Sequence, residues 1–388
     1  MTTPPPFHLR TADDLRRRGS VKWSTAGDVL GAGVAEMDFP ASEPVVAALR
    51  SAVDAQAFGY LPPSVAAATS RATAHRLRSA YRWDVPASAV HLVADVHTAF
   101  RTAVEHFSAP GSPVVVPTPA YMPFLAAPGI LGRPLVEVPM ARAAGGWTLD
   151  LDAISRALEP AGGLVVLVNP HNPTGHVHTR AELLALADVV AATGARVLAD
   201  EIHAPLVLPG ATHVPYASLS ATTAAHTVTA VSASKAWNLP GLKCAQLVTT
   251  NPADDATWER IAVVAGQGAS TLGAIATTAA YTEGGPWLEE VRDYLDGTRA
   301  LLVDLVAEHL PEVRWTPPQG TYLAWLDCRG LDLAMAPATF FAERAGVAGV
   351  DGAACGAVGA GWLRYNFATP RPLVEQAVRH MGAAAARA

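Results

Sequence analysis

The middle of this 388-residue sequence alternates short strand-like runs with longer segments of helical periodicity. The strand-like runs are Leu164–Val168, Arg196–Ala199 and Val228–Val231, and helix-like segments cover Asp152–Leu158 and Arg180–Ala192. A longer helical region, Trp258–Tyr281, follows the third run. Strands that are nearly continuous in Val and Leu are buried on both faces, and intervening helices indicate that the strands pair in parallel. The pattern predicts an α/β fold with a mostly parallel sheet covered by helices.

A polar cluster follows each of the three strand-like runs. The clusters are Asn169–Gly175 (N-P-H-N-P-T-G), Asp200–His203 (D-E-I-H) and Ser232–Lys235 (S-A-S-K). In parallel sheets, ligands bind beyond the carboxyl ends of the strands. Packing does not explain three polar clusters at three consecutive strand ends, so we expect a binding site at this edge of the sheet.

Lys235 lies directly after an apolar strand, among small residues that include Ser232 and Ser234. An amine held there is partly desolvated, which lowers its pKa and suits nucleophilic Schiff-base chemistry. The tetrapeptide alone is better interpreted as an ordinary loop lysine. Because two further polar clusters share the same edge, we predict that Lys235 is catalytic.

Length and composition narrow the class of protein. A chain of 388 residues is long for one core, so we expect two domains. A net charge of −6 lacks the excess of positive charge that is typical of nucleic-acid-binding proteins. No apolar run reaches membrane-spanning length. The cysteines Cys244, Cys328 and Cys355 are widely spaced and form no C-x-x-C, which indicates buried thiols in a reducing cytoplasm.

The three clusters together resemble the pyridoxal-phosphate enzymes of fold type I, the group of the class I and II aminotransferases. Two further segments, A-E-M-D-F-P (residues 35–40) and W-L-R-Y-N-F-A-T-P-R (residues 362–371), are most similar to the cystathionine β-lyase (MalY/PatB) branch. That branch more usually has aspartate at the position of Glu36. The resemblance covers about residues 15 to 382.

The resemblance implies a domain organisation and an assembly. A large cofactor-binding domain is expected over residues 45–280. A smaller α+β domain is expected to combine residues 1–44 with residues 281–388, and its N-terminal arm closes over the active site. The enzyme is expected to be a homodimer with shared active sites.

The same resemblance assigns residues around the pyridine ring of pyridoxal 5′-phosphate. Lys235 is the lysine that bonds to the cofactor, Asp200 stabilises the charge on the ring nitrogen, and Tyr121 packs on or beside the ring and is also expected to be catalytic. Asn172 donates to the ring 3-oxygen, and His203 stands where many aminotransferases have a tyrosine that shares this oxygen. Without the other motifs, Asp200 would be interpreted as a helix N-cap and His203 as structural.

The phosphate is expected at the start of the helix that follows Asp95, because a helix N-terminus offers N–H groups and a favourable dipole to an anion. His97 replaces the glycine or small residue of most relatives, and Lys243 replaces an arginine. The residues assigned to the phosphate are Val96, His97, Thr98, Ser232, Lys243 and, from the neighbouring subunit, Tyr60. Ser234, which flanks Lys235, is assigned to the cofactor.

The substrate is expected to be an amino acid. Arg364 matches the arginine that binds the α-carboxylate, since a planar guanidinium binds a carboxylate through two parallel hydrogen bonds. Gly33 and Val34 are expected to touch substrate through backbone groups, and Asn172 also contacts it. Arg371, which lies between two prolines, is interpreted as structural.

The resemblance favours β-elimination from a cysteine S-conjugate such as cystathionine, which releases a thiol, pyruvate and ammonia. An aminotransferase acting on an amino acid and a 2-oxo acid is the alternative, because no residue alone dictates the outcome. A non-enzymatic regulator fused to a DNA-binding domain is disfavoured, since the first 40 residues are too few for such a domain.

A metal site is the rival interpretation of several histidines. His171, His176 and His178 are close in sequence and could be combined with Asp200 and His203. The chain has no H-E-x-x-H motif and no paired cysteines, and the first two histidines are interleaved with turn residues. We therefore predict no metal.

Overall fold

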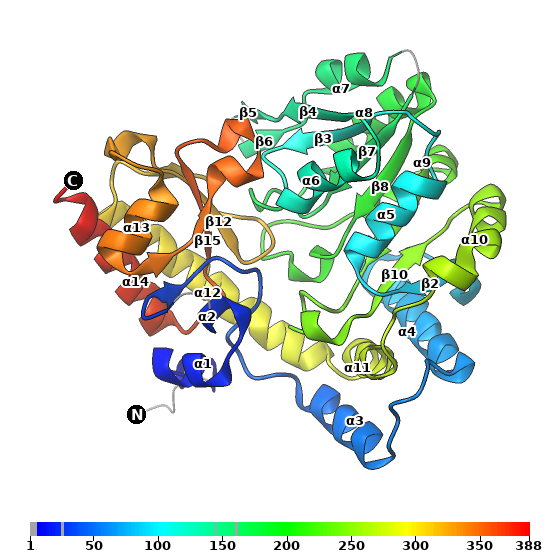
Figure 1. Ribbon diagram of the computed structural model, residues 1–388, viewed down its shortest axis with the longest axis horizontal. Coiled ribbons are helices and arrows are strands. Elements are labelled where there is room, and N and C mark those ends of the chain that lie inside the picture. The colour runs from blue at the N-terminus through cyan, green and yellow to red at the C-terminus, as the bar shows by residue number, and fades with distance from the viewer. Residues whose placement is uncertain (1–5, 25–26, 144–145, 160–161) are drawn as a thin grey trace.

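The computed structural model describes residues 6–24, 27–143, 146–159 and 162–388 and is organised around a seven-stranded sheet (Figure 1). In spatial order the strands are β2 (Val90–Val93), β10 (Ala245–Val248), β9 (Thr227–Val231), β8 (Arg196–Asp200), β7 (Leu164–Val168), β3 (Val114–Thr118) and β4 (Leu135–Pro139). Strand β10 runs antiparallel to both of its neighbours, and the other observed pairs are parallel. The predicted fold class is confirmed.

Strands β7, β8 and β9 are adjacent and parallel, as their apolar runs predicted. Every residue of β3, β7 and β9 is buried. Alternate residues of these strands face opposite sides, so Val166 joins one hydrophobic core and Val165 the other. The polar clusters that follow the three strands therefore meet at one edge of the sheet.

Helices cover both faces of the sheet (Figure 1). One core includes residues of α5 (Val96–His106), α6 (Met122–Ile130) and α10 (Pro252–Ala265), and the opposite core includes residues of α7 (Leu151–Leu158) and α8 (Arg180–Thr193). The remaining elements of this region are α3 (Glu43–Asp54), α4 (Pro63–Tyr81), α9 (Ala221–His226), α11 (Thr271–Thr282) and the hairpin of β5 (Ala141–Ala143) and β6 (Gly146–Thr148).

One predicted helix is wrong in extent. The expected helical region Trp258–Tyr281 is divided between α10 and α11. Gly268 in the break has a φ of +93°, which is outside the helical range, and Ser270 caps α11 by accepting a hydrogen bond from the Gly273 N–H. Alanine favours helix, and the alanines on both sides of the break predicted one continuous helix.

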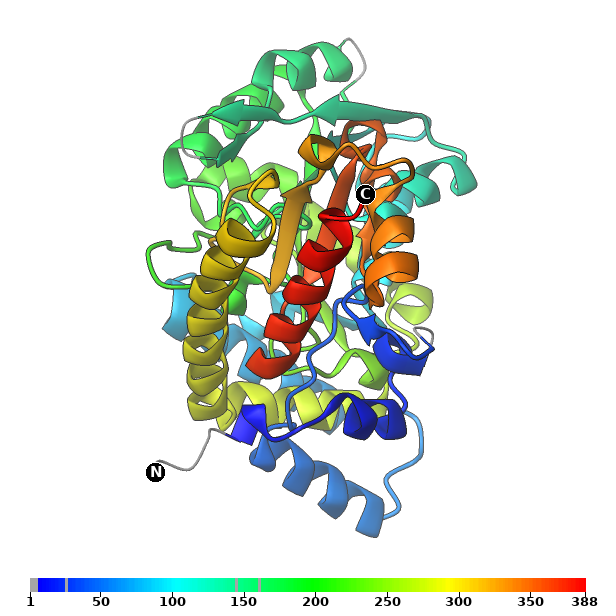
Figure 2. The ribbon, with the colours of Figure 1, turned by 90° about the vertical axis from the view of Figure 1, so that its left-hand side faces the viewer.

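A second, antiparallel sheet lies toward the C-terminus. Its strands, in spatial order, are β11 (Arg314–Trp315), β12 (Leu323–Asp327), β15 (Trp362–Asn366) and β14 (Val350–Asp351). Figure 2 shows α12 (Gly285–His309) and α14 (Arg371–Ala385) side by side across this sheet, with α13 (Pro337–Ala345) next to them. This sheet supplies β15, which carries Arg364.

The N-terminal segment packs against the C-terminal region. It contains α1 (Ala12–Arg18), α2 (Val21–Ser24) and β1 (Leu30–Gly31), and β1 pairs in parallel with β13 (Val347–Ala348). Lys22 and Asp38 form a fully buried ion pair at 2.8 Å, and Trp23 Nε1 donates to the same carboxylate at 2.9 Å. Removing one partner of such a pair lowers the free energy of unfolding by about 3–5 kcal/mol, because the other charge stays buried without a partner.

This packing supports the expected division into residues 45–280 and the two terminal segments, which stays a prediction. The core formed by the termini also includes Leu206, Leu208 and Trp237, so the two parts share apolar contacts. The three cysteines are free and buried, as predicted. Among the described residues, no helix combines the length and hydrophobicity needed to cross a membrane.

Candidate active site

A cavity of about 500 Å³ opens at the carboxyl ends of β7, β8 and β9. Its wall combines the polar clusters of these strands with the start of α5, the N-terminal segment and β15. The predicted site residues that line it are Gly33, Val34, Val96, His97, Tyr121, Asn172, Asp200, His203, Ser232, Ser234, Lys235, Lys243 and Arg364. The fold thus brings together residues from most of the length of the chain.

The chain contains three lysines, and all three line this cavity. Two are engaged by carboxylates: Lys22 by Asp38, and Lys243 by Asp95 at 2.8 Å. Lys235 has no ion pair among the described residues. Its amine is therefore the one of the three that is available for chemistry.

The Lys235 amine donates a hydrogen bond to the Ala35 carbonyl at 2.8 Å. Burial lowers the pKa of this amine to about 8, and the positive charge of Arg364 acts in the same direction, while Asp200 opposes it. A lower pKa leaves more of the amine unprotonated near neutral pH, as a nucleophile or general base requires. The N-terminal segment thus holds the reactive amine in place.

Asp200 ends β8 at the floor of the cavity. Its carboxylate accepts a hydrogen bond from the Ile202 N–H at 3.1 Å, and burial raises its pKa to about 7. Burial disfavours the ionised carboxylate, so a cationic partner in the cavity would stabilise it. This environment fits a protonated ring nitrogen.

His203 is buried in the wall of the same cavity, and its Nδ1 has no hydrogen-bond partner. Burial, followed by the positive charges of Lys235 and Arg364, lowers its pKa to about 3, so the imidazole is neutral. Its ring lies edge to face with the Tyr322 ring, with 6.0 Å between the ring centroids. A buried, unpartnered nitrogen in a cavity wall indicates that a bound group completes its hydrogen bonding.

Arg364 is buried on β15, with its guanidinium held from two sides. One terminal nitrogen donates to Asn172 Oδ1 at 3.1 Å and the other to the Gly33 carbonyl at 3.0 Å, while Nε has no partner. The loop after β7 and the N-terminal segment therefore fix the plane of this fork. An immobilised guanidinium at the cavity wall suits the recognition of a carboxylate.

The start of α5 forms another part of the wall. Asp95 caps this helix by accepting hydrogen bonds from the Thr98 N–H at 2.8 Å and the Thr98 hydroxyl at 2.9 Å. Thr98 does not line the cavity, and both of its donors serve the cap. Its predicted contact with phosphate stays a prediction.

His97, the residue that departs from the family pattern, lies within hydrogen-bonding distance of the Tyr121 hydroxyl at 3.1 Å. The two rings lie edge to face, with 5.5 Å between their centroids. Burial lowers the pKa of His97 and raises that of Tyr121, so both groups are neutral near pH 7. Contact with His97 therefore restricts the orientation of the Tyr121 ring at the cavity.

Two predicted or rival residues lie elsewhere. Tyr60 is fully exposed and does not line the cavity of its own chain. Arg371 packs its guanidinium over the Tyr294 ring at 4.5 Å, and its Nε donates to Thr298, so its structural interpretation is confirmed. Asp200 and His203 line the cavity whereas His176 does not, so the rival five-residue metal cluster is not assembled.

Sequence reasoning missed some residues of the wall. Asp95 could have been recognised as a helix N-cap, because it directly precedes an apolar helical segment. Lys22, which lies in the N-terminal segment, was not assigned to the site. Ala35 contributes a backbone carbonyl, for which the sequence carries no signal.

Comparisons with known proteins agree with this geometry. The family model for aminotransferase class I and II matches residues 28–381. Cystathionine β-lyase of Corynebacterium glutamicum is 36% identical, with 95% of this chain and 97% of that protein covered. Cystathionine β-lyase PatB of Bacillus subtilis is 32% identical, with 94% and 96% covered.

A solved structure from Corynebacterium diphtheriae, provisionally described as a pyridoxal-phosphate-dependent β-cystathionase, superimposes with a TM-score of 0.93. It is 37% identical, and the match covers 98% of this chain and 99% of that one. Family match, full-length identity and shared fold agree with the resemblance noted in the sequence. The chain belongs to the aminotransferase class I and II family, in the branch that includes the PatB protein.

Proposed function

We propose that this protein is a pyridoxal-phosphate-dependent carbon–sulfur β-lyase. It would cleave a cysteine S-conjugate such as cystathionine, with water, to a thiol, pyruvate and ammonia. The observation that carries the proposal is the cavity itself, in which the Lys235 amine, without an ion pair among the described residues, and the Arg364 fork line the same space. Full-length similarity to proteins named cystathionine β-lyase supports the choice of reaction.

The cavity residues fit the cofactor. Lys235 would bond to its aldehyde, Asp200 would hold a proton on its ring nitrogen, and the orphaned Nδ1 of His203 and the amide of Asn172 would serve its ring oxygen. Val96 and His97 at the start of α5, together with Ser232, Ser234 and Lys243, would surround its phosphate. When bound, pyridoxal phosphate supplies the electron sink for charge left on the substrate Cα.

The chain's own groups then position and deprotonate the substrate. Arg364 binds the α-carboxylate, and its hydrogen bonds to Gly33 and Asn172 fix the plane of the guanidinium. The Lys235 amine takes the proton from Cα, for which a pKa near 8 is well matched at neutral pH. The Cβ–S bond then breaks, and its electron pair leaves on sulfur as a thiolate.

The reaction itself gives the first prediction. Purified, cofactor-loaded protein incubated with cystathionine or a simple S-alkyl cysteine is expected to release thiol and pyruvate in equal amounts without an added 2-oxo acid. Lys235→Ala serves as the inactive control. Turnover that strictly requires a 2-oxo acid, with no thiol released from any conjugate, would identify an aminotransferase instead.

The protein is also proposed to work as a homodimer in the cytoplasm. The free, buried cysteines are compatible with a reducing compartment. Tyr60 is fully exposed and Phe58 is 60% exposed, so this segment offers aromatic surface to a second subunit. Tyr60 would then reach the cofactor phosphate of its partner.

A mixing experiment tests this shared site. Lys235→Ala and Tyr60→Phe chains, each first shown to be inactive, are unfolded together and refolded. If Tyr60 acts across the dimer, half of the chains form mixed dimers with one intact site, and about a quarter of wild-type activity returns. An absence of recovery in isolated mixed dimers would contradict the assignment of Tyr60.

A further inference from the structure

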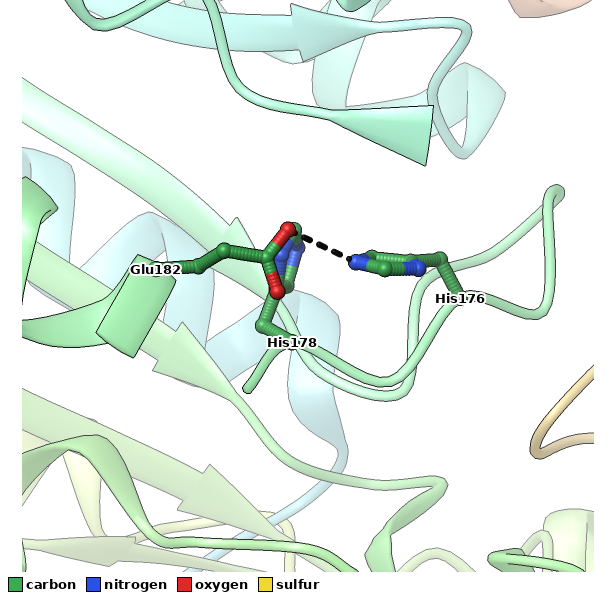
Figure 3. Close-up of side chains that lie close together, drawn as sticks. All are labelled: His176, His178 and Glu182. Atoms are coloured by element: carbon green, nitrogen blue, oxygen red, sulfur yellow. Dashed lines mark hydrogen bonds and ion pairs between the residues drawn. The ribbon is translucent and has the colours of Figure 1, made fainter. Parts of the chain in front are cut away.

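Outside the cavity, two histidines and a glutamate converge where the segment after β7 enters α8 (Figure 3). His176 and His178 are two positions apart in a segment without regular structure, and Glu182 is the third residue of α8. In the sequence the three residues form an H-x-H-x₃-E pattern. None of them lines the cavity described above.

The possible ligand atoms of these three residues all lie within 4.8 Å of one another. His176 Nε2 is 3.1 Å from Glu182 Oε1. The other carboxylate oxygen accepts hydrogen bonds from the Thr179 N–H at 2.7 Å and the Thr179 hydroxyl at 2.8 Å. The helix cap therefore orients the carboxylate and leaves Oε1 directed at the histidines, as an outer partner does for a metal ligand.

His178 is the part of this cluster that packing leaves unexplained. Its side chain is completely buried, and neither ring nitrogen has a hydrogen-bond partner. An imidazole always carries at least one N–H, and its unprotonated nitrogen needs a donor or a metal ion. A capping interaction accounts for the contact between His176 and Glu182 but gives no role to the adjacent, unsatisfied ring of His178.

We propose that His176, His178 and Glu182 bind a divalent transition-metal ion, with zinc as the best match. Two neutral imidazoles and a carboxylate are typical zinc ligands, at about 2.0–2.2 Å, and water can take a fourth tetrahedral position. Such bonds require ligand atoms roughly 3.3 Å apart, and the ligand atoms lie within 4.8 Å of one another, so the His178 ring moves inward by up to about 1.5 Å when the ion binds.

The site has a structural role. The backbone N–H of His178 donates to Asn169 Oδ1 at 3.1 Å, and the backbone N–H of Val177 donates to Gln319 Oε1 at 3.0 Å. The metal ion braces this segment, which follows Asn172 of the cavity wall. It takes no part in the chemistry proposed for Lys235.

The test measures zinc on the cofactor-loaded protein. After equilibration with zinc and removal of free ions, about one ion per chain should remain, with its affinity measured against a chromophoric chelator. His178→Gln and Glu182→Gln should each weaken binding by at least about 100-fold. His380→Gln, a change at an exposed histidine of α14, should bind zinc as the wild type does.

Zinc should also raise the melting temperature of the wild type and of His380→Gln, but not of the two ligand variants. If His178→Gln does not fold, His176→Gln replaces it, since His176 is partly accessible. Wild-type protein that retains no zinc would overturn the proposal and indicate that a buried water satisfies His178. Equal zinc affinity in the wild type and the folded ligand variants would overturn it as well.

Discussion

Lys235→Ala is expected to lower lyase turnover by at least about 1,000-fold, because the change removes both the amine that bonds to the cofactor and the base that takes the Cα proton. The folded structure should persist, since Lys235 makes no ion pair among the described residues and its amine donates to a single carbonyl, that of Ala35. Circular dichroism and thermal melting check the fold.

The covalent link can be located directly. Borohydride treatment of the wild-type protein should fix the cofactor on one peptide, and the chain offers only Lys22, Lys235 and Lys243 as side-chain amines. Mass spectrometry should find the adduct on Lys235. Lys243→Ala removes another cavity lysine, so the adduct should stay on Lys235 in the fraction of this variant that retains the cofactor. An adduct on Lys22 or Lys243 in the wild type would refute the assignment.

Arg364→Ala is expected to raise the KM for amino-acid substrates while the visible absorbance of the bound cofactor stays unchanged. Losing one partner of a buried, charge-assisted carboxylate interaction costs about 2–5 kcal/mol, which is roughly 30-fold or more in KM. Arg364→Lys should recover only a small part of the loss, because an ammonium group lacks the planar fork held by Asn172 and Gly33.

Arg371 provides the matched control for this experiment. It lies seven positions further along the chain and packs on Tyr294, so Arg371→Ala should lower thermal stability and leave KM unaltered in the folded fraction. An unchanged KM in Arg364→Ala would move carboxylate recognition to another residue. A loss of cofactor absorbance in that variant would mean that Arg364 supports cofactor binding instead.

Local sequence pattern was sufficient for much of the architecture. The predicted strand Leu164–Val168 agrees with β7 at both ends, and the predicted helix Arg180–Ala192 differs from α8 by one residue. These elements depend on hydrophobic periodicity and on caps within a few residues, which a single sequence contains. The clustering of three polar motifs followed from the geometry of parallel strands, since their carboxyl ends share one edge.

The identities of the expected cofactor and substrate groups came from family resemblance, and their physical environment came from long-range packing. Lys235 meets Ala35 across 200 positions, and Arg364 meets Asn172 across 192 positions. Such contacts form when the N-terminal segment and the C-terminal sheet close over the main sheet, and no local pattern encodes them.

The same distinction explains the pKa values and the histidine cluster. Asp200, His203 and Lys235 have shifted pKa values chiefly because burial removes water around them. The residues that exclude this water come from distant segments. Likewise, H-x-H-x₃-E is an unremarkable pattern until the chain brings both imidazoles within 4.8 Å of the Glu182 carboxylate and buries His178 without a partner. The sequence shows which residues are near along the chain, whereas the removal of water around them and the approach of their side chains depend on the packed fold.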